Sequence, residues 1–432
     1  MNQVVGKNKC LASLGDLLSF IVCVIIYIVF GVLFSNGLIL ILSCCAYSTV
    51  MIIKSRKNIM LWIISFFSFF CIYSILLFHW FDIIEYSSLY GYKYFHNDFD
   101  IMMTSAKCLY LFYATIYVLF PKKAESSNNN PIFDNITTYS NVALPYLISI
   151  TIISIVSLYF IVRSFSSGYS ESPYYEYLIV FYILALFYSG NRRSYLIPIY
   201  ILLTINSIFV FASGDRGSAM QFLLVIFFVR YQHRIKKKTL IIILVLGIVF
   251  LSGIGSWRGY YDFSLSIFSN AFRALLNNKL ALNTAYAADA AGHCIIRLSH
   301  DYSVWGRLKL FGEYLAQVFI GSSMFGNDVN LSALSQIKYN YHGGGGLLTY
   351  YAYFYIGYFG CILSGILVSY YLKKVGKYKN ADQPSIYYRV IVVYFCSTMT
   401  RWFLYSPAPL FRGMLFLLIC TWFMRKLETI MS

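Results

Sequence analysis

Charged residues are scarce in this sequence. Asp, Glu, Lys and Arg together make up 12% of its 432 residues, whereas 59% are hydrophobic and the mean hydropathy is +0.65. This composition excludes an ordinary soluble enzyme and is typical of a protein that crosses a membrane several times. The formal net charge is +17, which in a soluble protein would suggest nucleic acid as a partner. In a membrane protein the positions of the basic residues matter more than their total, so we expect no nucleic-acid partner.

Patterns typical of metal sites, disulfide frameworks and exported proteins are also missing. The chain has no HExxH spacing and no CxxC pair, and nine of its ten cysteines lie in or beside apolar runs or near the N-terminus. We therefore expect neither a disulfide framework nor a metal-binding cysteine pair. No small-residue cleavage site follows the first apolar run, so we expect that run to be retained as a helix.

The sequence does contain a series of long apolar runs. A helix needs about 20 mainly apolar residues to cross a bilayer, and a search for such runs predicts about twelve transmembrane helices. They lie near residues 15–34, 36–53, 59–78, 101–120, 142–162, 176–190, 195–212, 218–232, 239–256, 346–372, 386–405 and 408–424. The predicted fold class is therefore all-α, a polytopic integral membrane protein.

The basic residues are distributed unevenly between the two sides of this arrangement. Most of the 34 Lys and Arg residues fall in short loops on one side, which include KSRK, NRR, RYQHRIKKK and KKVGKYK. The positive-inside rule assigns that side to the cytoplasm. We therefore expect a multi-pass protein whose N- and C-termini are both cytoplasmic.

One connection is too long to be a simple turn. Residues 256–345 lie on the outer side between the ninth and tenth predicted helices, and SIFSNAFRALLNNKLALNTAYAADAAG and GRLKLFGEYLAQVFIG place apolar residues at helical spacing. We expect this segment to form amphipathic helices on the outer face of the membrane. The predicted organisation is helices 1–9 in residues 1–255, the large outer (periplasmic) loop in 256–345 and helices 10–12 in 346–432.

An Asp-Arg pair interrupts two apolar runs in the outer turn between the seventh and eighth predicted helices. In SGDRGS, Asp215 can cap the helix that follows and the glycines allow a tight bend, so the free N–H groups of the helix N-terminus point outward. Together with the guanidinium of Arg216 they form a site for an anion. The alternative is an arginine that only reaches phospholipid head groups, with Asp215 as a simple cap.

Other arginines lie at the same outer level. TRWFLYSPAPLFRG places Arg401 at the outer end of the eleventh predicted helix and Arg412 at the start of the twelfth, and Arg258 ends the ninth. Arginine presents a fixed fork of donors that suits phosphate, so such a set favours a pyrophosphate-bearing lipid as ligand. Each arginine taken alone could equally be an ordinary interface residue.

Three of the six histidines lie in the long outer segment, namely His293, His300 and His342. His342 opens YHGGGGLL, where four glycines allow the backbone to approach a ligand closely just before the tenth predicted helix. A histidine at that point could act as a general base. It could equally be a hydrogen-bonded residue beside a flexible hinge.

These features resemble the oligosaccharide repeat-unit polymerases, or O-antigen polymerases, and in architecture also the O-antigen ligases. The resemblance covers nearly the whole chain. It rests on the twelve predicted helices, the large outer loop, SGDRGS, and the glycine-rich HGGGGLLTYYAYFYIGYFGCILSG that follows the loop. YSGNRRSY also resembles an arginine motif of this family, although the predicted topology places Arg192 and Arg193 on the inner side.

The resemblance implies a metal-independent membrane glycosyltransferase of the bacterial inner membrane that uses no cofactor. It would transfer a growing glycan from undecaprenyl pyrophosphate to a sugar hydroxyl of the next lipid-linked repeat unit, in lipopolysaccharide or related surface-polysaccharide biosynthesis. Its partners would be the undecaprenyl-pyrophosphate-linked oligosaccharide, membrane lipid, and a flippase and chain-length regulator. The expected roles are catalysis by His342, Arg216 and Arg258, pyrophosphate binding by Arg216, Arg401, Arg412 and Asp215, and His293, His300 or Asp262 as alternative bases.

Three other functions stay open. An O-antigen ligase would share the architecture. A metal-dependent glycosyltransferase acting on polyprenyl-phosphate sugars could use Asp82 and Glu85 of HWFDIIE. A flippase for the lipid-linked unit would also need basic residues along a lipid path, but it should lack the large outer loop and carry its charges at mid-membrane.

Overall fold

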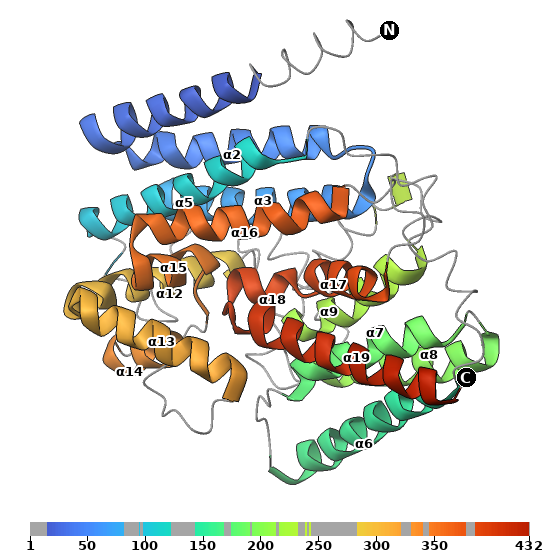
Figure 1. The fold of residues 1–432 in the computed structure, drawn as a ribbon. Helices are drawn as coiled ribbons and strands as arrows, with labels where there is room; N and C mark the ends of the chain where they lie inside the picture. The colour runs from blue at the N-terminus through green and yellow to red at the C-terminus, as the bar shows by residue number, and fades with distance from the viewer. Residues whose placement is uncertain are drawn as a thin grey trace, which may run out of the picture. The chain divides into compact units, whose positions relative to one another are not determined.

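The fold is composed of helices. The computed structural model describes residues 15–81, 95, 98–121, 143–167, 174–190, 192–212, 216–231, 238–239, 242, 283–320, 330–339, 345–376 and 385–431. Within these ranges every regular element is a helix and no strand occurs (Figure 1). The prediction of an all-α chain is therefore confirmed for the part of the chain that the structure describes.

The helices of the first half follow the predicted apolar runs closely. They are Gly15–Leu33, whose last part is the π-helical η1 (Tyr27–Leu33), α2 (Gly37–Lys54), α3 (Ile59–Ile75), η2 (Leu76–Trp80), α5 (Phe99–Leu119), α6 (Ala143–Ser167), α7 (Tyr174–Tyr188), α8 (Arg193–Ala212), α9 (Arg216–Ile226) and η5 (Phe227–Tyr231). The ninth predicted helix, near 239–256, lies almost entirely outside the described residues.

The second half contains more and shorter helices. They are α12 (Asn283–Asp301), α13 (Val304–Ile320), α14 (Leu331–Tyr339), α15 (Leu348–Ile356), α16 (Tyr358–Gly376), α17 (Ile386–Ser397), α18 (Met399–Leu404), η9 (Pro409–Gly413) and α19 (Met414–Met431). The single helix predicted over 346–372 is thus broken into α15 and α16. The break lies at Gly357, whose φ of 70° is accessible to glycine but costly for residues with a Cβ atom.

Four helices among the described residues are long and apolar enough to cross a membrane. They are Gly15–Leu33, Gly37–Lys54, Phe99–Leu119 and Arg193–Val210. Five shorter apolar helices accompany them, at Ile59–Ile75, Ala143–Tyr159, Tyr177–Tyr188, Gly217–Val229 and Ile386–Ser397. These lengths and compositions are those of a helical membrane protein, whereas the number of twelve spans stays a prediction.

The segment 256–345 is helical where the structure describes it. It contains α12, α13 and α14, and α13 carries a row of exposed apolar side chains on one face, at spacings of three, seven and four residues. That row comprises Trp305, Leu308, Leu315 and Phe319. Such a row is typical of a helix that lies against lipid, which agrees with the amphipathic helices predicted here. The position of this segment outside the membrane stays a prediction.

The chain divides into two compact units built from non-contiguous segments. Unit 1 comprises Met1–Arg56, Leu61–Ala124 and Thr284–Gly376, and unit 2 comprises Lys57–Met60, Glu125–Asn283 and Lys377–Ser432. The predicted organisation divided the chain into consecutive segments instead. The observed units are defined by contacts between segments that are far apart in the sequence. Such contacts cannot be predicted from the order of apolar runs along the chain.

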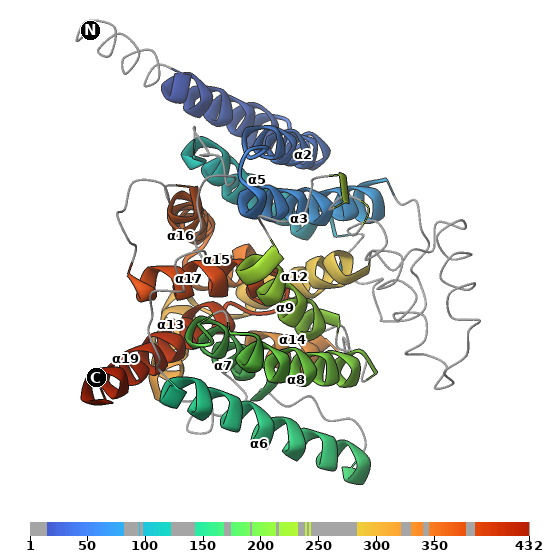
Figure 2. The ribbon, with the colours of Figure 1, turned by 90° about the vertical axis from the view of Figure 1, so that its right-hand side faces the viewer.

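In unit 1, α5 is the central helix. It packs against α2 and α16, and α3, α2 and α16 run beside it in Figures 1 and 2. Its N-cap, Asp98, accepts hydrogen bonds from the backbone N–H groups of Asp100 and Ile101, which fixes where the helix begins. Gly365 of α16 lies so close to α5 that a Cβ atom there would meet the Thr115 side chain at 2.8 Å. Close helix packing of this kind needs small residues at the contact.

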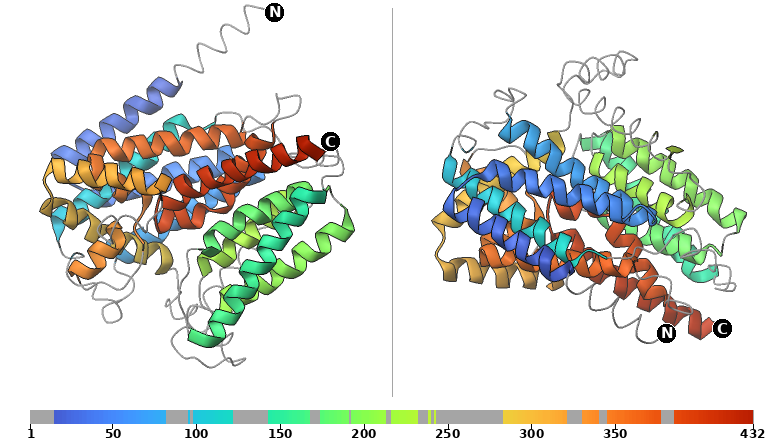
Figure 3. Two further views of the ribbon diagram at one scale, coloured as in Figure 1. Left: turned by 60° about the horizontal axis from the view of Figure 1, so that its bottom comes forward. Right: turned by 90° about the horizontal axis from the view of Figure 1, so that it is seen from above.

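Unit 2 contains a group of apolar helices around α7. In Figure 2 and in the left view of Figure 3, α6, α7 and α8 run side by side, and α7 also packs against α9 and α17. Inside this group, Asn206 of α8 donates hydrogen bonds to Ser157 of α6 and to Tyr182 of α7, at 2.8 and 2.6 Å. A buried amide that joins three helices fixes their register, because an unpaired polar group would be costly there.

Candidate functional sites

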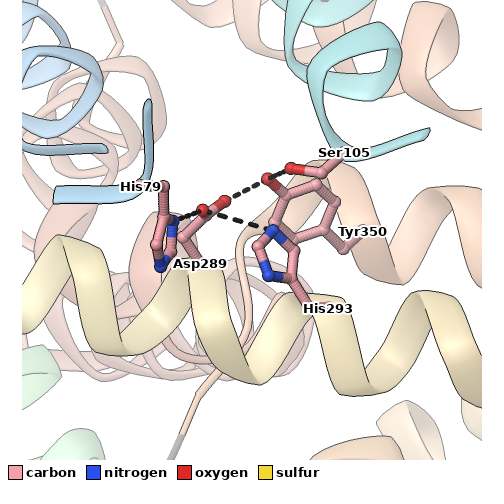
Figure 4. A network of polar contacts seen from close by, with 5 residues as sticks. All are labelled: His79, Ser105, Asp289, His293 and Tyr350. Atoms are coloured by element: carbon pink, nitrogen blue, oxygen red, sulfur yellow. Dashed lines mark hydrogen bonds and ion pairs between the residues drawn. The ribbon is translucent and has the colours of Figure 1, made fainter. Parts of the chain in front are cut away.

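A buried polar network lies between three helices and the end of a fourth in unit 1. It consists of His79 of η2, Asp289 and His293 of α12, Tyr350 of α15 and Ser105 of α5 (Figure 4). All five side chains are buried, and the two histidines and the aspartate are no more than 5% exposed. The network therefore brings two imidazoles, a carboxylate and two hydroxyls together away from solvent.

Both oxygens of the Asp289 carboxylate take part in the network. Oδ2 lies 2.5 Å from Nδ1 of His79 and 3.4 Å from Nε2 of His293, while Oδ1 accepts a short hydrogen bond from the Tyr350 hydroxyl. The Tyr350 hydroxyl also lies 2.7 Å from the hydroxyl of Ser105. Asp289 is therefore the centre of the network, with imidazoles on one oxygen and a tyrosine on the other (Figure 4).

Local backbone features position the two histidines. His79 lies in the π-helical turn η2, and an inserted residue of this kind changes the direction in which the side chains at the end of α3 point. The neighbouring Trp80 packs over Gly37 at the start of α2, where a Cβ atom would overlap the indole ring. On α12, Asp289 and His293 are four residues apart, so both side chains lie on one face of the helix.

A glycine of α12 allows Tyr350 to reach Asp289. The ring of Tyr350 packs directly on Gly292 of α12, and a methyl group on Gly292 would overlap it. The break at Gly357 ends α15 and lets α16 begin at once in another direction. The absence of a side chain at Gly292 lets the hydroxyl of Tyr350 reach a carboxylate that is 61 residues away in the sequence.

Burial and hydrogen bonding have opposite effects on the charge of Asp289. Burial alone would raise the pKa of its carboxyl, because a charge is costly away from water. The nearby imidazoles of His293 and His79 and the hydrogen bonds from His79 and Tyr350 outweigh that effect, so the pKa lies below its ordinary value. Asp289 is therefore an anion at neutral pH and stabilises positive charge on its surroundings.

The same three side chains form a possible metal-binding group. One ligand atom from each of His79, Asp289 and His293 can be chosen so that all of them lie within 4.8 Å of one another. Two imidazoles and a carboxylate are common ligands of zinc and other divalent transition metals. Chemically, the network can therefore hold either a shared proton or a metal ion.

A second site in unit 2 joins two of the arginine-containing stretches. The guanidinium of Arg401 in α18 donates a hydrogen bond from Nη2 to Oγ of Ser218, at 2.7 Å, and Thr400 Oγ1 donates to the carbonyl oxygen of Gly217 at 3.4 Å. Ser218 is the third residue of α9, which begins at Arg216. A guanidinium therefore lies at the N-terminal turn of a helix whose first N–H groups can bind an anion.

Arg412 lies close to Arg401 in the sequence but contacts a different helix. It lies in η9 and its Nη1 donates to the hydroxyl of Tyr177 in α7, at 3.4 Å. The side chains of Arg401 and Arg412 are both partly buried, which limits their contact with water. Unit 2 therefore places two of the predicted arginines inside the helix group, on different partners.

The remaining predicted site residues fall into two groups. Arg216 is the first residue of α9, and only its backbone belongs to the described part of the chain. Four further residues lie outside the described residues altogether: Asp215, Arg258, Asp262 and His342. His293 belongs to the buried network of unit 1. His300 lies on the exposed surface of α12, seven residues further along the same helix, and is not part of that network.

Sequence reasoning missed His79 and Asp289 as members of one site. His79 precedes the acidic residues of HWFDIIE that attracted attention, and it lies 210 residues from Asp289, a separation that no local motif reveals. The available signal was the pair formed by Asp289 and His293, four residues apart in the alanine-rich AADAAGHC. On an amphipathic helix, two ionisable residues four positions apart among small residues such as alanine lie on one buried face and indicate a polar site there.

The class that these elements define is a helical membrane protein with a buried polar network and a separate arginine site. The sequence matches no known protein-family model, and comparisons with characterised proteins and with solved structures likewise find no match.

Proposed function

We propose that the protein polymerises lipid-linked oligosaccharide repeat units at the bacterial inner membrane. In this reaction a hydroxyl of the next repeat unit attacks the anomeric carbon of the growing glycan. The bond from that carbon to undecaprenyl pyrophosphate breaks, the pyrophosphate takes the bonding electrons, and a base takes the hydroxyl proton. The product is a glycan longer by one unit on the acceptor lipid.

The observation that carries the proposal is the hydrogen bond from Arg401 to Ser218 in the first turn of α9. It supports a single anion site built from SGDRGS and from TRWFLYSPAPLFRG, two stretches that lie far apart in the sequence. Arg401 and the helix N-terminus both favour negative charge at one place. A pyrophosphate at the surface of an apolar helix group is the anion expected for a lipid-linked substrate.

Such a site would accelerate transfer by acting on the leaving group. Negative charge grows on the pyrophosphate as the anomeric bond breaks, so fixed donors stabilise the transition state more than the bound substrate. Arg216 would add a second guanidinium at the same helix terminus. The fixed positive charge of arginine meets the chemical need of this step, so the proposed transfer requires no metal ion at the pyrophosphate.

The base that accepts the hydroxyl proton is proposed to be His342. Of its alternatives, His293 is 2% exposed and faces Asp289, a position that favours a structural role over contact with a sugar. His300 is exposed and lies outside the buried network, so it is available to substrate. Asp262 stays a further alternative.

The experiment that tests the proposal is a gel of surface polysaccharide from a strain that lacks this protein. A polymerase predicts loss of the ladder of chain lengths, with a single repeat unit still present on the lipid core. Loss of every repeat from the core, with polymer accumulating on the carrier lipid, would instead identify a ligase. A normal ladder would contradict both assignments.

A further inference from the structure

We propose that His79, Asp289 and His293 form a binding site for one divalent transition-metal ion, of which zinc is the expected occupant. The three ligand atoms come from two places far apart in the sequence and meet within 4.8 Å of one another in unit 1. This inference does not rest on the proposed function, whose arginine site belongs to unit 2. It also departs from the expectation of no metal, which came from the local spacing of the histidines and cysteines and from the family resemblance.

The composition of the site selects the kind of metal. Imidazole nitrogen and carboxylate oxygen are typical ligands of zinc and its neighbours in the transition series, whereas calcium and magnesium prefer sites made of oxygen atoms. Zinc binds nitrogen and oxygen at about 2.0–2.2 Å, so its ligand atoms lie roughly 3.3 Å apart in a tetrahedral arrangement. The 3.4 Å between Nε2 of His293 and Oδ2 of Asp289 matches that spacing.

The contact of His79 with the same oxygen is shorter, at 2.5 Å, which is below the length of an ordinary N–H···O hydrogen bond. A metal ion would compete with the proton of this hydrogen bond and move the two atoms apart by somewhat less than 1 Å. A change of that size requires only a small rotation of side chains at the end of a π-helical turn.

The surrounding residues provide the support that a metal ligand normally has. Carboxylates that bind a metal are usually held by hydrogen bonds from residues outside the coordination sphere. Here the Tyr350 hydroxyl donates to Oδ1 of Asp289, which leaves Oδ2 for the two histidines, and Ser105 lies 2.7 Å beyond Tyr350 (Figure 4). This division between the two oxygens is an observation independent of the histidine pair.

The burial of the Asp289 carboxylate between two histidines favours a bound metal ion over a proton. A fully buried carboxylate needs positive charge close to it, and two imidazoles face a single oxygen of Asp289 where one protonated histidine would suffice. A divalent ion uses both imidazoles in their neutral form and the carboxylate as an anion. The ion would join η2 to α12 and so stabilise unit 1.

The test begins with the metal content of the full-length protein, purified in detergent through a tag that contains no histidine. We expect about one zinc ion per chain. After removal of metal with a chelator, titration with Co²⁺ should produce the visible absorption of a four- or five-coordinate cobalt site, saturating at one equivalent. Absence of both signals in folded protein would overturn the proposal and leave a network held by protons.

Variants locate the site. Asp289→Asn and His293→Asn should abolish the cobalt signal, whereas His300→Asn, which changes the exposed histidine of the same helix, should bind Co²⁺ as the wild type does. Tyr350→Phe removes only the supporting hydroxyl, so it should keep one equivalent of Co²⁺ with affinity lowered about 10–100-fold. Full binding by Asp289→Asn would place the metal elsewhere and contradict the proposal.

A measurement on wild-type protein covers the case in which the ligand variants do not fold. Added Zn²⁺ should raise the midpoint of thermal unfolding of chelator-treated wild type, and by a larger amount at higher free Zn²⁺ concentration. His300→Asn should show the same increase, and Tyr350→Phe should require about 10–100-fold more Zn²⁺ to reach it. A midpoint that does not respond to Zn²⁺ would overturn the proposal.

Discussion

Arg401 donates a hydrogen bond to Ser218 over 2.7 Å, although the two residues are 183 positions apart in the sequence. The contact brings the hairpin of the last two predicted spans to the first turn of α9 within unit 2. Each of these segments carries an arginine that the predicted topology places on the outer side. Their contact supports a single anion-binding region rather than two independent interface residues.

The packing of Tyr350 on Gly292 gives a first prediction. Gly292→Ala places a methyl group into the tyrosine ring, so it should destabilise the protein by about 1–3 kcal/mol. Gly312→Ala is the matched control, since a Cβ atom on this exposed glycine of α13 meets nothing within 4 Å. The control should be neutral or stabilising by about 0.5–1 kcal/mol. Equal shifts in the thermal unfolding midpoint of the two variants would show that the packing is not as described.

The end of α12 is joined to α14 by an ion pair whose strength should depend on pH. Asp301 lies 2.9 Å from Lys338 Nζ and accepts a hydrogen bond from Tyr339 at 2.7 Å, and these two hydrogen bonds lower the pKa of Asp301 below its ordinary value of 3.8. A carboxyl with a lowered pKa in the folded state stabilises the protein above its unfolded pKa. That contribution is lost as the pH falls through the folded pKa.

Thermal unfolding of wild type and Asp301→Asn at two pH values measures this contribution. At pH 7 the wild type should be more stable than Asp301→Asn by at most about 1 kcal/mol, because solvent screens an exposed ion pair. This difference between the two proteins should vanish near pH 2. A difference that is the same at both pH values would mean that the charge of Asp301 does not contribute.

Much of the helical framework could be predicted from the sequence, because long apolar runs determine where helices form in a membrane protein. The start of α9 at Arg216 and the helices within 256–345 are examples. The break at Gly357 was missed because the apolar pattern continues through it, and only the positive φ reveals the turn. Hydropathy measures composition and does not report backbone direction.

The candidate sites were less predictable, because each depends on contacts between distant segments. His79 and Asp289 have no common motif, and their meeting follows from the π-helical turn at the end of α3 and from the way α12 packs in unit 1. His293 was singled out, but as a possible base rather than as a buried partner of Asp289. Side-chain types in a sequence indicate the available chemistry, whereas tertiary packing decides which of them meet.

The topology predicted from the basic residues, with α13 outside the cytoplasm, gives a third prediction. Lys309 is 79% exposed, so Lys309→Cys in a background without the native cysteines should react with a membrane-impermeant thiol reagent in spheroplasts. Lys426→Cys, exposed near the end of α19 and predicted to be cytoplasmic, is the matched control. It should react only after the inner membrane is broken. The reverse pattern would invert the topology and exclude an outer site.

The proposed base gives a fourth prediction. His342→Gln removes the basic nitrogen that would accept the proton, so repeat-unit transfer should fall by about 100-fold or more while the amount of protein in the membrane stays normal. His300→Gln, a change at an exposed histidine of α12, should leave transfer close to wild type. Full activity of His342→Gln would exclude it as the base and favour Asp262 or one of the other histidines.

We propose that Arg216 at the start of α9 and Arg401 of α18, which reaches the first turn of α9, hold a lipid pyrophosphate as it leaves. A deletion strain that produces Arg216 or Arg401 variants tests it through the ladder of polysaccharide chain lengths, with membrane protein levels measured in parallel. Replacement of either arginine by Gln should abolish the ladder, since loss of one fixed donor costs about 10²–10³ in rate, and replacement by Lys should restore only a small part. Arg425→Gln, on the exposed surface of α19, is the control and should give a normal ladder. A normal ladder from Arg401→Gln, or equal ladders from the Lys variants and wild type, would contradict the pyrophosphate site.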